Sequence, residues 1–293
     1  MPCVLYFQHH PFNGEDMLKL VDIYLPDEVN TQLGRYQSDI DILPDYTSQV
    51  NLAEQYWENR TNNRTFDVVR EKLSSMCPGG DALRRCCYCE DSCATDVEHI
   101  WPKNLYPGKA FVWINYLYAC GGCNSPKNNK FAVFTDSDVP IHVQRKPRDP
   151  ILAPVTGVGV LIDPRTEDPL DFIWLDLTNS DESRFSPRKD VPTRDQARAR
   201  YTIETSLELN RSPLPKARRR AYRIYKDLVE LYILARNRGD FPVDLGRYVA
   251  EIKGSDHPSV WKEMQRQAQN PRIQAENPEL YQLFQAAPEA LTW

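Results

Sequence analysis

Apolar residues recur at intervals of three and four along both ends of the chain, a spacing typical of amphipathic helices. The longest such run extends from Leu214 to Ala235 and is closed by Gly239, so it predicts one long helix. Thr65 is the expected cap of another helix. Shorter runs predict helices over 15–25, 52–60, 65–76, 243–253, 259–269 and 278–287. Both ends of the chain are therefore expected to be mostly helical.

The middle of the chain has a different pattern. Residues 78–80, Pro-Gly-Gly, interrupt the helical periodicity, and 81–131 is expected to hold a turn, two strands and a helix. Residues 139–192 are rich in proline and aspartate. Within them, the apolar runs 157–162 and 172–175 predict strands that form a hairpin against the core.

These patterns together predict an α+β fold. Thr193 and Gln196 have the spacing of a capping box, which predicts a further helix extending toward Asn210. The expected regions are an acidic helical region (1–80), a small core (81–135), an irregular segment with short strands (136–192) and a helical region with a basic helix (193–293).

Cysteines are concentrated in the expected core. They form two Cys-x-x-Cys pairs, Cys86 with Cys89 and Cys120 with Cys123. Four thiolates can close the tetrahedral shell of a Zn²⁺ ion, so we expect a structural zinc site. Cys87 and Cys93 remain alternative ligands. The chain begins without a secretory signal pattern, which favours a reducing, cytoplasmic compartment where clustered cysteines bind metal.

A glutamate and a histidine stand side by side between the two cysteine pairs. Glu98 and His99 precede Pro102, which is expected to end a strand. A neutral imidazole can deprotonate water, and an adjacent carboxylate is a hard oxygen ligand for Mg²⁺. Asn115 lies in an apolar run, and Asn124 follows the second cysteine pair at an expected helix start, where capping is the alternative role.

In these motifs the chain resembles the HNH endonucleases of the ββα-metal type in their four-cysteine form. That family shares Cys-x-x-Cys, Asp/Glu-His-x-x-Pro, Asn and Cys-x-x-Cys-His/Asn-x-x-Lys, and the match runs from Cys86 to Lys127. The resemblance implies a zinc-stapled ββα-metal core within helical flanks. It also implies metal-dependent hydrolysis of phosphodiester bonds, with DNA the favoured substrate.

The resemblance also implies roles for individual residues. His99 would be the general base, and Glu98 a ligand of the catalytic metal. Asn115 would brace the loop between the two strands and hold the His99 ring through its backbone. Asn124 would complete the metal site, and Lys127 would contact a phosphate.

Asn124 stands where the family more often has histidine. Amide and carboxylate oxygens favour Mg²⁺ or Mn²⁺ over Zn²⁺ as the catalytic ion. Asn128, one helical turn further on, is a second candidate for the same role. Lys103 is a further expected contact for nucleic acid.

A narrower resemblance extends past the cysteine pairs. Segments 111–115, 161–164, 167–169, 202–203 and 209–211 are similar to the HNH effectors of Septu-type and retron-associated antiphage systems. Those effectors work beside an ABC-type ATPase, so the resemblance implies such a partner in bacterial antiphage defence.

Charge is distributed unevenly. The chain has 293 residues and a net charge of −5, with six Lys/Arg against twelve Asp/Glu over 1–80 and thirteen against four over 184–226. Arg218, Arg219 and Arg220 lie in the long predicted helix, and clustered cations of this kind favour phosphate contacts. The alternative is a solvated helix face.

Other functions remain open at this level. A nuclease of the same fold that cuts RNA, such as tRNA, is the first alternative, and a non-catalytic zinc-stapled module that binds nucleic acid or a protein is the second. A homodimer that makes paired nicks competes with the ATPase partner. The sequence has no apolar run long enough to cross a membrane, so no membrane association is expected.

Overall fold

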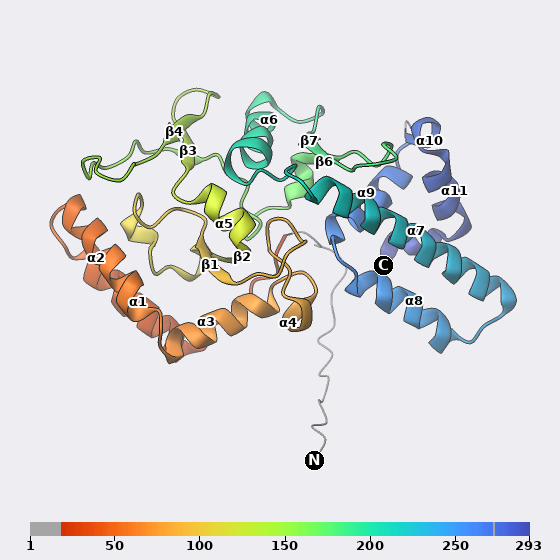
Figure 1. Ribbon diagram of the computed structural model, residues 1–293, viewed down its shortest axis with the longest axis horizontal. Helices are drawn as coiled ribbons and strands as arrows, with labels where there is room; N and C mark the ends of the chain where they lie inside the picture. Colours follow the sequence, from red (N-terminus) through yellow and green to blue (C-terminus); the bar gives the residue numbers. More distant parts are fainter. Residues whose placement is uncertain (1–18, 272) are drawn as a thin grey trace, which may run out of the picture.

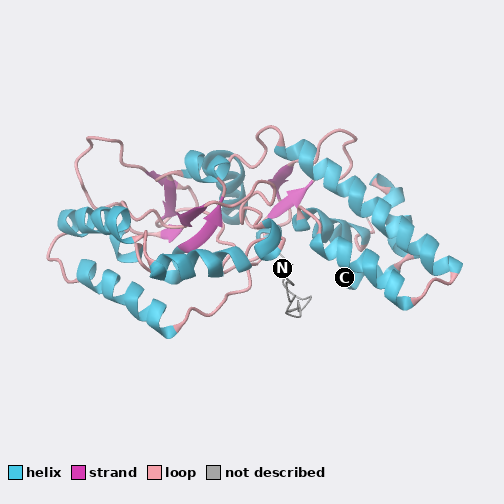
Figure 2. Ribbon diagram, turned by 60° about the horizontal axis from the view of Figure 1, so that its bottom comes forward, coloured by secondary structure: helices cyan, strands magenta, loops and turns pink. Residues whose placement is uncertain are grey.

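The fold is α+β and elongated. A computed structural model describes residues 19–271 and 273–293 of the chain. Figure 1 shows helices α1, α2 and α3 at one end and α7, α8, α9 and α11 at the other, with small sheets and the short helices α5 and α6 between them. Figure 2 shows the same order of parts from a second direction.

Helices provide most of the regular structure. They are α1 (Asp27–Asp41), α2 (Tyr46–Arg60), α3 (Arg64–Ser75), α4 (Gly80–Leu83), α5 (Gly121–Lys127), α6 (Thr193–Arg200), α7 (Leu214–Arg238), α8 (Pro242–Gly254), α9 (Pro258–Ala268), α10 (Ile273–Glu276) and α11 (Pro278–Ala286). The strands are β1 (Asp96–His99), β2 (Tyr116–Ala119), β3 (Phe131–Phe134), β4 (Ile141–Val143), β5 (Val158–Gly159), β6 (Ile173–Leu175) and β7 (Phe185–Pro187).

The N-terminal helices differ from the expected ones at their starts. The helix expected over 15–25 begins outside the described residues, and the structure has no helix from residue 19 to residue 26. Helix α2 includes the expected 52–60 but begins six residues earlier, because the Asp45 carboxylate accepts a 2.9 Å hydrogen bond from Ser48 N. Helix α3 is capped by Asn63 rather than Thr65, through a 3.1 Å bond from Phe66 N.

The C-terminal helices follow the apolar periodicity closely. Helix α7 ends at Gly239, whose φ of 83° is the left-handed geometry that glycine permits at a helix end. Helices α8, α9 and α11 lie within a residue or two of their expected bounds. The expected capping box is wrong: Pro192 precedes α6 without a side-chain cap, and the Gln196 amide donates to the Val191 carbonyl instead.

The described residues form three small antiparallel sheets in the middle of the molecule. Their strand orders are β1-β2, β4-β3-β5 and β6-β7. The two apolar runs expected to form one hairpin are placed in different sheets, because β5 pairs with β3 and β6 pairs with β7. Apolar content predicted these strands, but it carries no information about which strand each one pairs with.

The N-terminal helices share a core with the middle of the chain. Phe66 and Leu73 of α3 are buried in the same cluster as Phe111 and Tyr116, which lie beside and within β2. A separate cluster, centred on Trp261, holds the C-terminal helices together. The β1-β2 hairpin therefore folds against α2 and α3 rather than standing apart from them.

Polar contacts join the cysteine-rich turn to the C-terminal helices. The Arg85 guanidinium donates to both carboxylate oxygens of Asp256 at 2.7 and 2.8 Å. The buried Glu90 carboxylate accepts hydrogen bonds from the backbone N and the hydroxyl of Ser259 at the start of α9.

Among the described residues, no helix is both long enough and apolar enough to span a bilayer.

Candidate metal centre and the adjacent Glu-His site

Four buried cysteines converge on one point. The sulfurs of Cys86, Cys89, Cys120 and Cys123 all lie within 4.8 Å of one another. The Sγ atoms of Cys89 and Cys120 are 3.8 Å apart, which equals the edge of a tetrahedron of sulfurs about 2.3 Å from a central zinc ion. The cluster can therefore hold a metal ion such as zinc with no open coordination position.

Two tight turns bring the sulfurs together. In the first, Cys86 N donates to Ser92 O and Glu90 N donates to Cys86 O, both at 2.9 Å, and Glu90 adopts a φ of +60°. In the second, Cys123 N donates to Cys120 O at 3.0 Å at the start of α5. Each Cys-x-x-Cys spacing thus turns its two side chains to one side.

The four sulfurs share their charge unequally. Hydrogen bonds from Cys123, Cys86 and Cys89 lower the pKa of Cys120, whereas the hydrogen bond with Cys120 raises the pKa of Cys86 and of Cys123. Arg211, about ninety positions away in sequence, places its Nη2 3.3 Å from the Cys123 sulfur. A cation that donates to a ligating thiolate stabilises its negative charge, so Arg211 supports the cluster from outside.

Cys87 and Cys93 lie outside the cluster. The Cys87 sulfur is 3.7 Å from the buried sulfur of Cys77, at the end of α3. Cys93 is exposed and directs its thiol to the Ala94 carbonyl. The structure thus groups Cys86, rather than either neighbour, with Cys89.

The β1-β2 pairing positions Glu98 and His99 at the end of a strand. Glu98 lies opposite Leu117, and His99 lies opposite Tyr116. The side chains of both are buried, with residue exposures of 5% and 6%. Consecutive strand residues point to opposite faces, so the two functional groups reach different neighbours.

The His99 ring is held in one orientation and kept neutral. Its Nε2 lies 2.9 Å from the Ala110 carbonyl oxygen, so Nε2 carries the proton and Nδ1 keeps its lone pair. The Trp57 ring of α2 packs edge-on at 4.2 Å between centroids. Burial, then the nearby Lys103 ammonium, lower the pKa of His99 well below its usual value.

Glu98 forms a buried ion pair with Lys127 of α5. The Lys127 side chain is fully buried, and its Nζ also donates to the His99 carbonyl at 2.6 Å. Burial raises the pKa of Glu98, and the Lys127 charge opposes that rise. The Lys127 ammonium therefore faces inward toward Glu98 and the His99 carbonyl, and its expected contact with a phosphate remains a prediction.

Asn115 braces the loop between the strands. Its Oδ1 accepts from Trp101 N at 2.8 Å, and its Nδ2 donates to the carbonyls of Trp101 and Lys109 at 3.0 and 2.9 Å. Asn115 was also expected to hold the His99 ring through its backbone. In the structure, the Asn115 carbonyl accepts from Ile100 N instead, and the Ala110 carbonyl holds the His99 ring.

Asn124 and Asn128 occupy different parts of α5. The N-cap of α5 is Cys120, so Asn124 lies inside the helix and does not cap it. Its Nδ2 donates to the Asp96 carboxylate at 3.1 Å, which places its amide beside β1. Asn128 terminates α5 with a φ of +41°.

Lys103 lies between the Glu-His pair and α2. Its Nζ is 5.3 Å from the centre of the Trp57 ring. Burial lowers the pKa of Lys103, whereas the charges of Glu98, Glu54 and Glu58 raise it. Two carboxylates of α2 therefore act on the same cation as Glu98.

The basic helix is only partly exposed. Arg218 is buried, donates to the Leu209 carbonyl at 2.5 Å, and lies 3.9 Å from the centre of the Phe185 ring. Its burial lowers its pKa to about 10. The expected contact between Arg218 and nucleic acid is therefore wrong for this structure, whereas Arg219 is half-buried and Arg220 is exposed.

Sequence patterns did not indicate Trp57, Ala110 or Arg211. Trp57 has no local motif that links it to His99, and Ala110 acts through its backbone, which any residue shares. Comparison of the chain with family models, curated proteins and solved structures found no match.

Proposed function

We propose that the chain is a metal-dependent endonuclease of the HNH, ββα-metal type, with DNA as its favoured substrate. The observation that carries the proposal is the neutral His99 ring, fixed by Ala110 beside Glu98 on a hairpin that the four-cysteine cluster anchors. Helix α5 returns from that cluster and packs Asn124 and Lys127 against β1.

Each residue of the site has a separate role in the proposed reaction. Glu98 and Asn124 supply oxygen ligands of the kind that Mg²⁺ or Mn²⁺ prefers. When bound there, such an ion would polarise the scissile phosphate and stabilise the leaving oxygen. His99 takes a proton from water at Nδ1, because Nε2 is engaged with the Ala110 carbonyl. Asn115 keeps the intervening loop in place.

Access to His99 is restricted in this structure. Trp57 covers the imidazole, and Glu98 and Lys127 satisfy each other's charge. We therefore propose a resting state in which α2 must shift before substrate reaches the site. A nuclease that is inactive until a partner protein releases it would have such a covered site. Because the chain resembles antiphage HNH proteins, we propose that this partner is an ATPase.

The test is a cleavage panel. Zinc-loaded protein and a His99→Ala variant are incubated with supercoiled plasmid, single-stranded DNA and bulk tRNA, each in Mg²⁺, Mn²⁺ or EDTA. Because Trp57 covers His99 in the resting state, the panel also includes Trp57→Ala. We expect plasmid cleavage that is at least as fast in Trp57→Ala as in wild type, needs the divalent ion and disappears in the His99→Ala variant. Cleavage of tRNA alone would make the protein an RNA nuclease, and equal cleavage by wild type and His99→Ala would remove His99 from the mechanism.

A further inference from the structure

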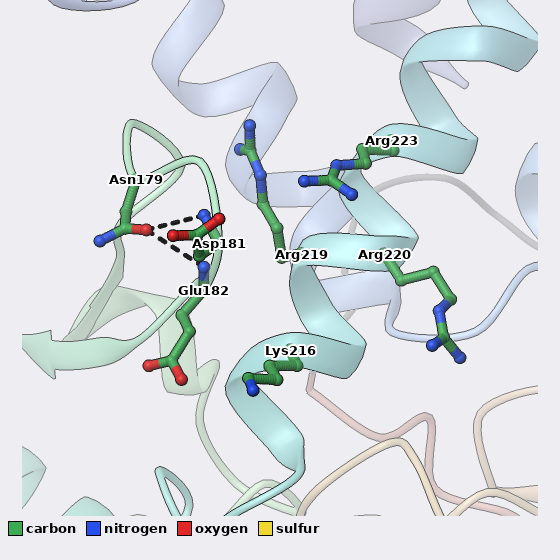
Figure 3. A pocket seen from close by; sticks show the side chains of 7 residues that line it. All are labelled: Asn179, Asp181, Glu182, Lys216, Arg219, Arg220 and Arg223. Atoms are coloured by element: carbon green, nitrogen blue, oxygen red, sulfur yellow. Dashed lines mark hydrogen bonds between the residues drawn. The ribbon is translucent and has the colours of Figure 1, made fainter.

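A hollow of about 610 Å³ lies between the first half of α7 and the loop that joins β6 to β7. Figure 3 shows Lys216, Arg219 and Arg223 of α7 on the side of the helix toward this loop, while Arg220 extends away from the loop. The lining residues are Asn179, Asp181, Glu182, Lys216, Arg219, Arg220 and Arg223. We call this surface the α7 groove.

The four cations of the groove differ from the other cations of α7 in their pairing. Among the described residues, none of Lys216, Arg219, Arg220 and Arg223 forms an ion pair, although the Arg219 charge acts on Glu279 from further away. Glu182 pairs with Arg184. The later half of α7 differs. There, Lys226 pairs with Glu279 at 2.9 Å, Arg236 with Glu289 at 2.6 Å and Arg238 with Asp240 at 2.5 Å. Unpaired charge is thus confined to one stretch of the helix.

Two of these cations are held close together. Arg219 Nε and Arg223 Nη2 both donate to the Ser180 carbonyl, at 3.1 and 2.7 Å. Arg219 Nη1 also donates to the Leu177 carbonyl at 2.9 Å. Two guanidinium groups on one oxygen repel each other, and an anion beside them would remove that repulsion. The loop therefore preorganises a site for negative charge.

The spacing of the cations suits a phosphate chain. Residues 216–223 span about 10 Å along a helix, a length that covers about three phosphates of one duplex strand. Arginine forks bind phosphate oxygens in pairs, and the free side chains of Lys216 and Arg220 add mobile charge at the edge. Asp181 and Glu182 limit the positive potential without neutralising it.

We infer that the α7 groove binds the phosphodiester backbone of nucleic acid through residues that are separate from the Glu-His site. The inference rests on the proposed function, because that function is what makes the bound nucleic acid the substrate of the protein. It replaces Arg218, which is buried, with Lys216 and Arg223 as backbone contacts beside Arg219 and Arg220.

The experiment measures binding without cleavage. In the full-length His99→Ala background, affinity for a labelled 30-base-pair DNA is followed by fluorescence anisotropy over a range of salt concentrations. The triple change Lys216→Gln, Arg220→Gln and Arg223→Gln should weaken binding at least tenfold. It should also make the plot of log K against log salt shallower by about 2.7, for three lost phosphate contacts.

A matched triple on the same helix separates the site from net charge. Lys226→Gln, Arg236→Gln and Arg238→Gln remove as much charge from paired positions, and the salt slope should stay within about 1 of the parent value. Equal losses in the two triples would overturn the inference, as would an unchanged slope in the groove triple. Thermal unfolding confirms that each variant is folded.

A gain-of-affinity variant covers the case in which the groove triple does not fold. Asp181→Asn removes a negative charge from the groove, so affinity for the same DNA should rise at least twofold at low salt. An unchanged or lower affinity counts against the site. If the groove results hold while neither wild type nor Trp57→Ala cuts, the nuclease proposal fails and the binding surface stands. If the protein cuts but the groove variants bind normally, only the groove fails.

Discussion

Arg211 contacts the four-cysteine cluster from a part of the chain far away in sequence. Its Nη2 donates to the Cys123 sulfur at 3.3 Å, and nearby Cys charge raises its pKa despite burial. Arg211→Met removes this donor, so we expect affinity for zinc to fall 10- to 100-fold. Competition with a chromophoric chelator measures the change.

A control for Arg211 is provided by an arginine of similar burial away from the cluster. The Arg188 guanidinium donates to both carboxylate oxygens of Asp190, and no contact between Arg188 and a cysteine is found among the described residues. The control variant is Arg188→Met. Its zinc affinity should equal that of the wild type. A normal zinc affinity in Arg211→Met would show that the contact contributes nothing to metal binding.

Asn115 is buried and makes three hydrogen bonds across one loop. Asn115→Ala leaves the Trp101 amide and the carbonyls of Trp101 and Lys109 without partners, so we expect a loss of about 2–3 kcal/mol in the free energy of unfolding. Urea denaturation measures it. Asn129→Ala, which removes a single bond to the Arg145 carbonyl, should cost less than about 1.5 kcal/mol. Equal costs would contradict the bracing role.

At the scale of elements, α2 is a cover for His99. Trp57→Ala should expose the imidazole, so the ring should react with diethyl pyrocarbonate several-fold faster, as followed by mass spectrometry of the His99 peptide. If α2 restrains the proposed nuclease, basal cleavage should rise as well. Trp174→Ala, in β6, should leave the His99 rate unchanged. A His99 peptide that reacts equally fast in wild type and Trp57→Ala would argue against a cover.

Helix α9 contains a buried acid that makes stability depend on pH. Burial raises the pKa of Glu263 to about 7, although the Arg266 charge opposes the rise. Between pH 4.5 and 7 the folded chain holds a proton that the unfolded chain has released. This stabilisation is full below pH 4.5 and is lost as the pH rises through 7, by up to about 3 kcal/mol.

Glu263→Gln tests that dependence. The variant cannot titrate at this position, so its midpoint of unfolding should change less than that of the wild type between pH 5 and pH 8. Urea titrations at several pH values give both curves. Parallel curves for the two proteins would mean that Glu263 does not titrate in this range.

Element prediction succeeded where the signal was local. The α7 periodicity and Gly239 determine a helix by themselves, and the structure has it at Leu214–Arg238. Helix α1 was missed although Val29, Leu33, Tyr36 and Ile40 recur at helical spacing, and no cap side chain marks its start at Pro26. The pairing of β5 with β3 was also missed, since short strands carry no signal for their partners.

At the scale of the whole molecule, the cysteine-rich turn links the N-terminal and C-terminal parts. Glu90 and Arg85 reach Ser259 and Asp256, while the hairpin beyond the turn packs against α2 and α3. The spacing of cysteines predicted the cluster because both pairs act through local turns. The contacts of Trp57 and Arg211 depend on the packing of distant segments, which a single sequence does not encode in any local pattern.

The measurement that tests the central claim most directly is the single-turnover rate of plasmid cleavage in Mg²⁺. It compares zinc-loaded wild type, Trp57→Ala, Trp57→Ala with His99→Ala, and His142→Ala, whose histidine is exposed and lies outside the site. We predict that His142→Ala matches wild type, that Trp57→Ala cuts at least as fast, and that loss of His99 abolishes cleavage. Cleavage that survives the loss of His99, or none by wild type and Trp57→Ala alike, would contradict the account.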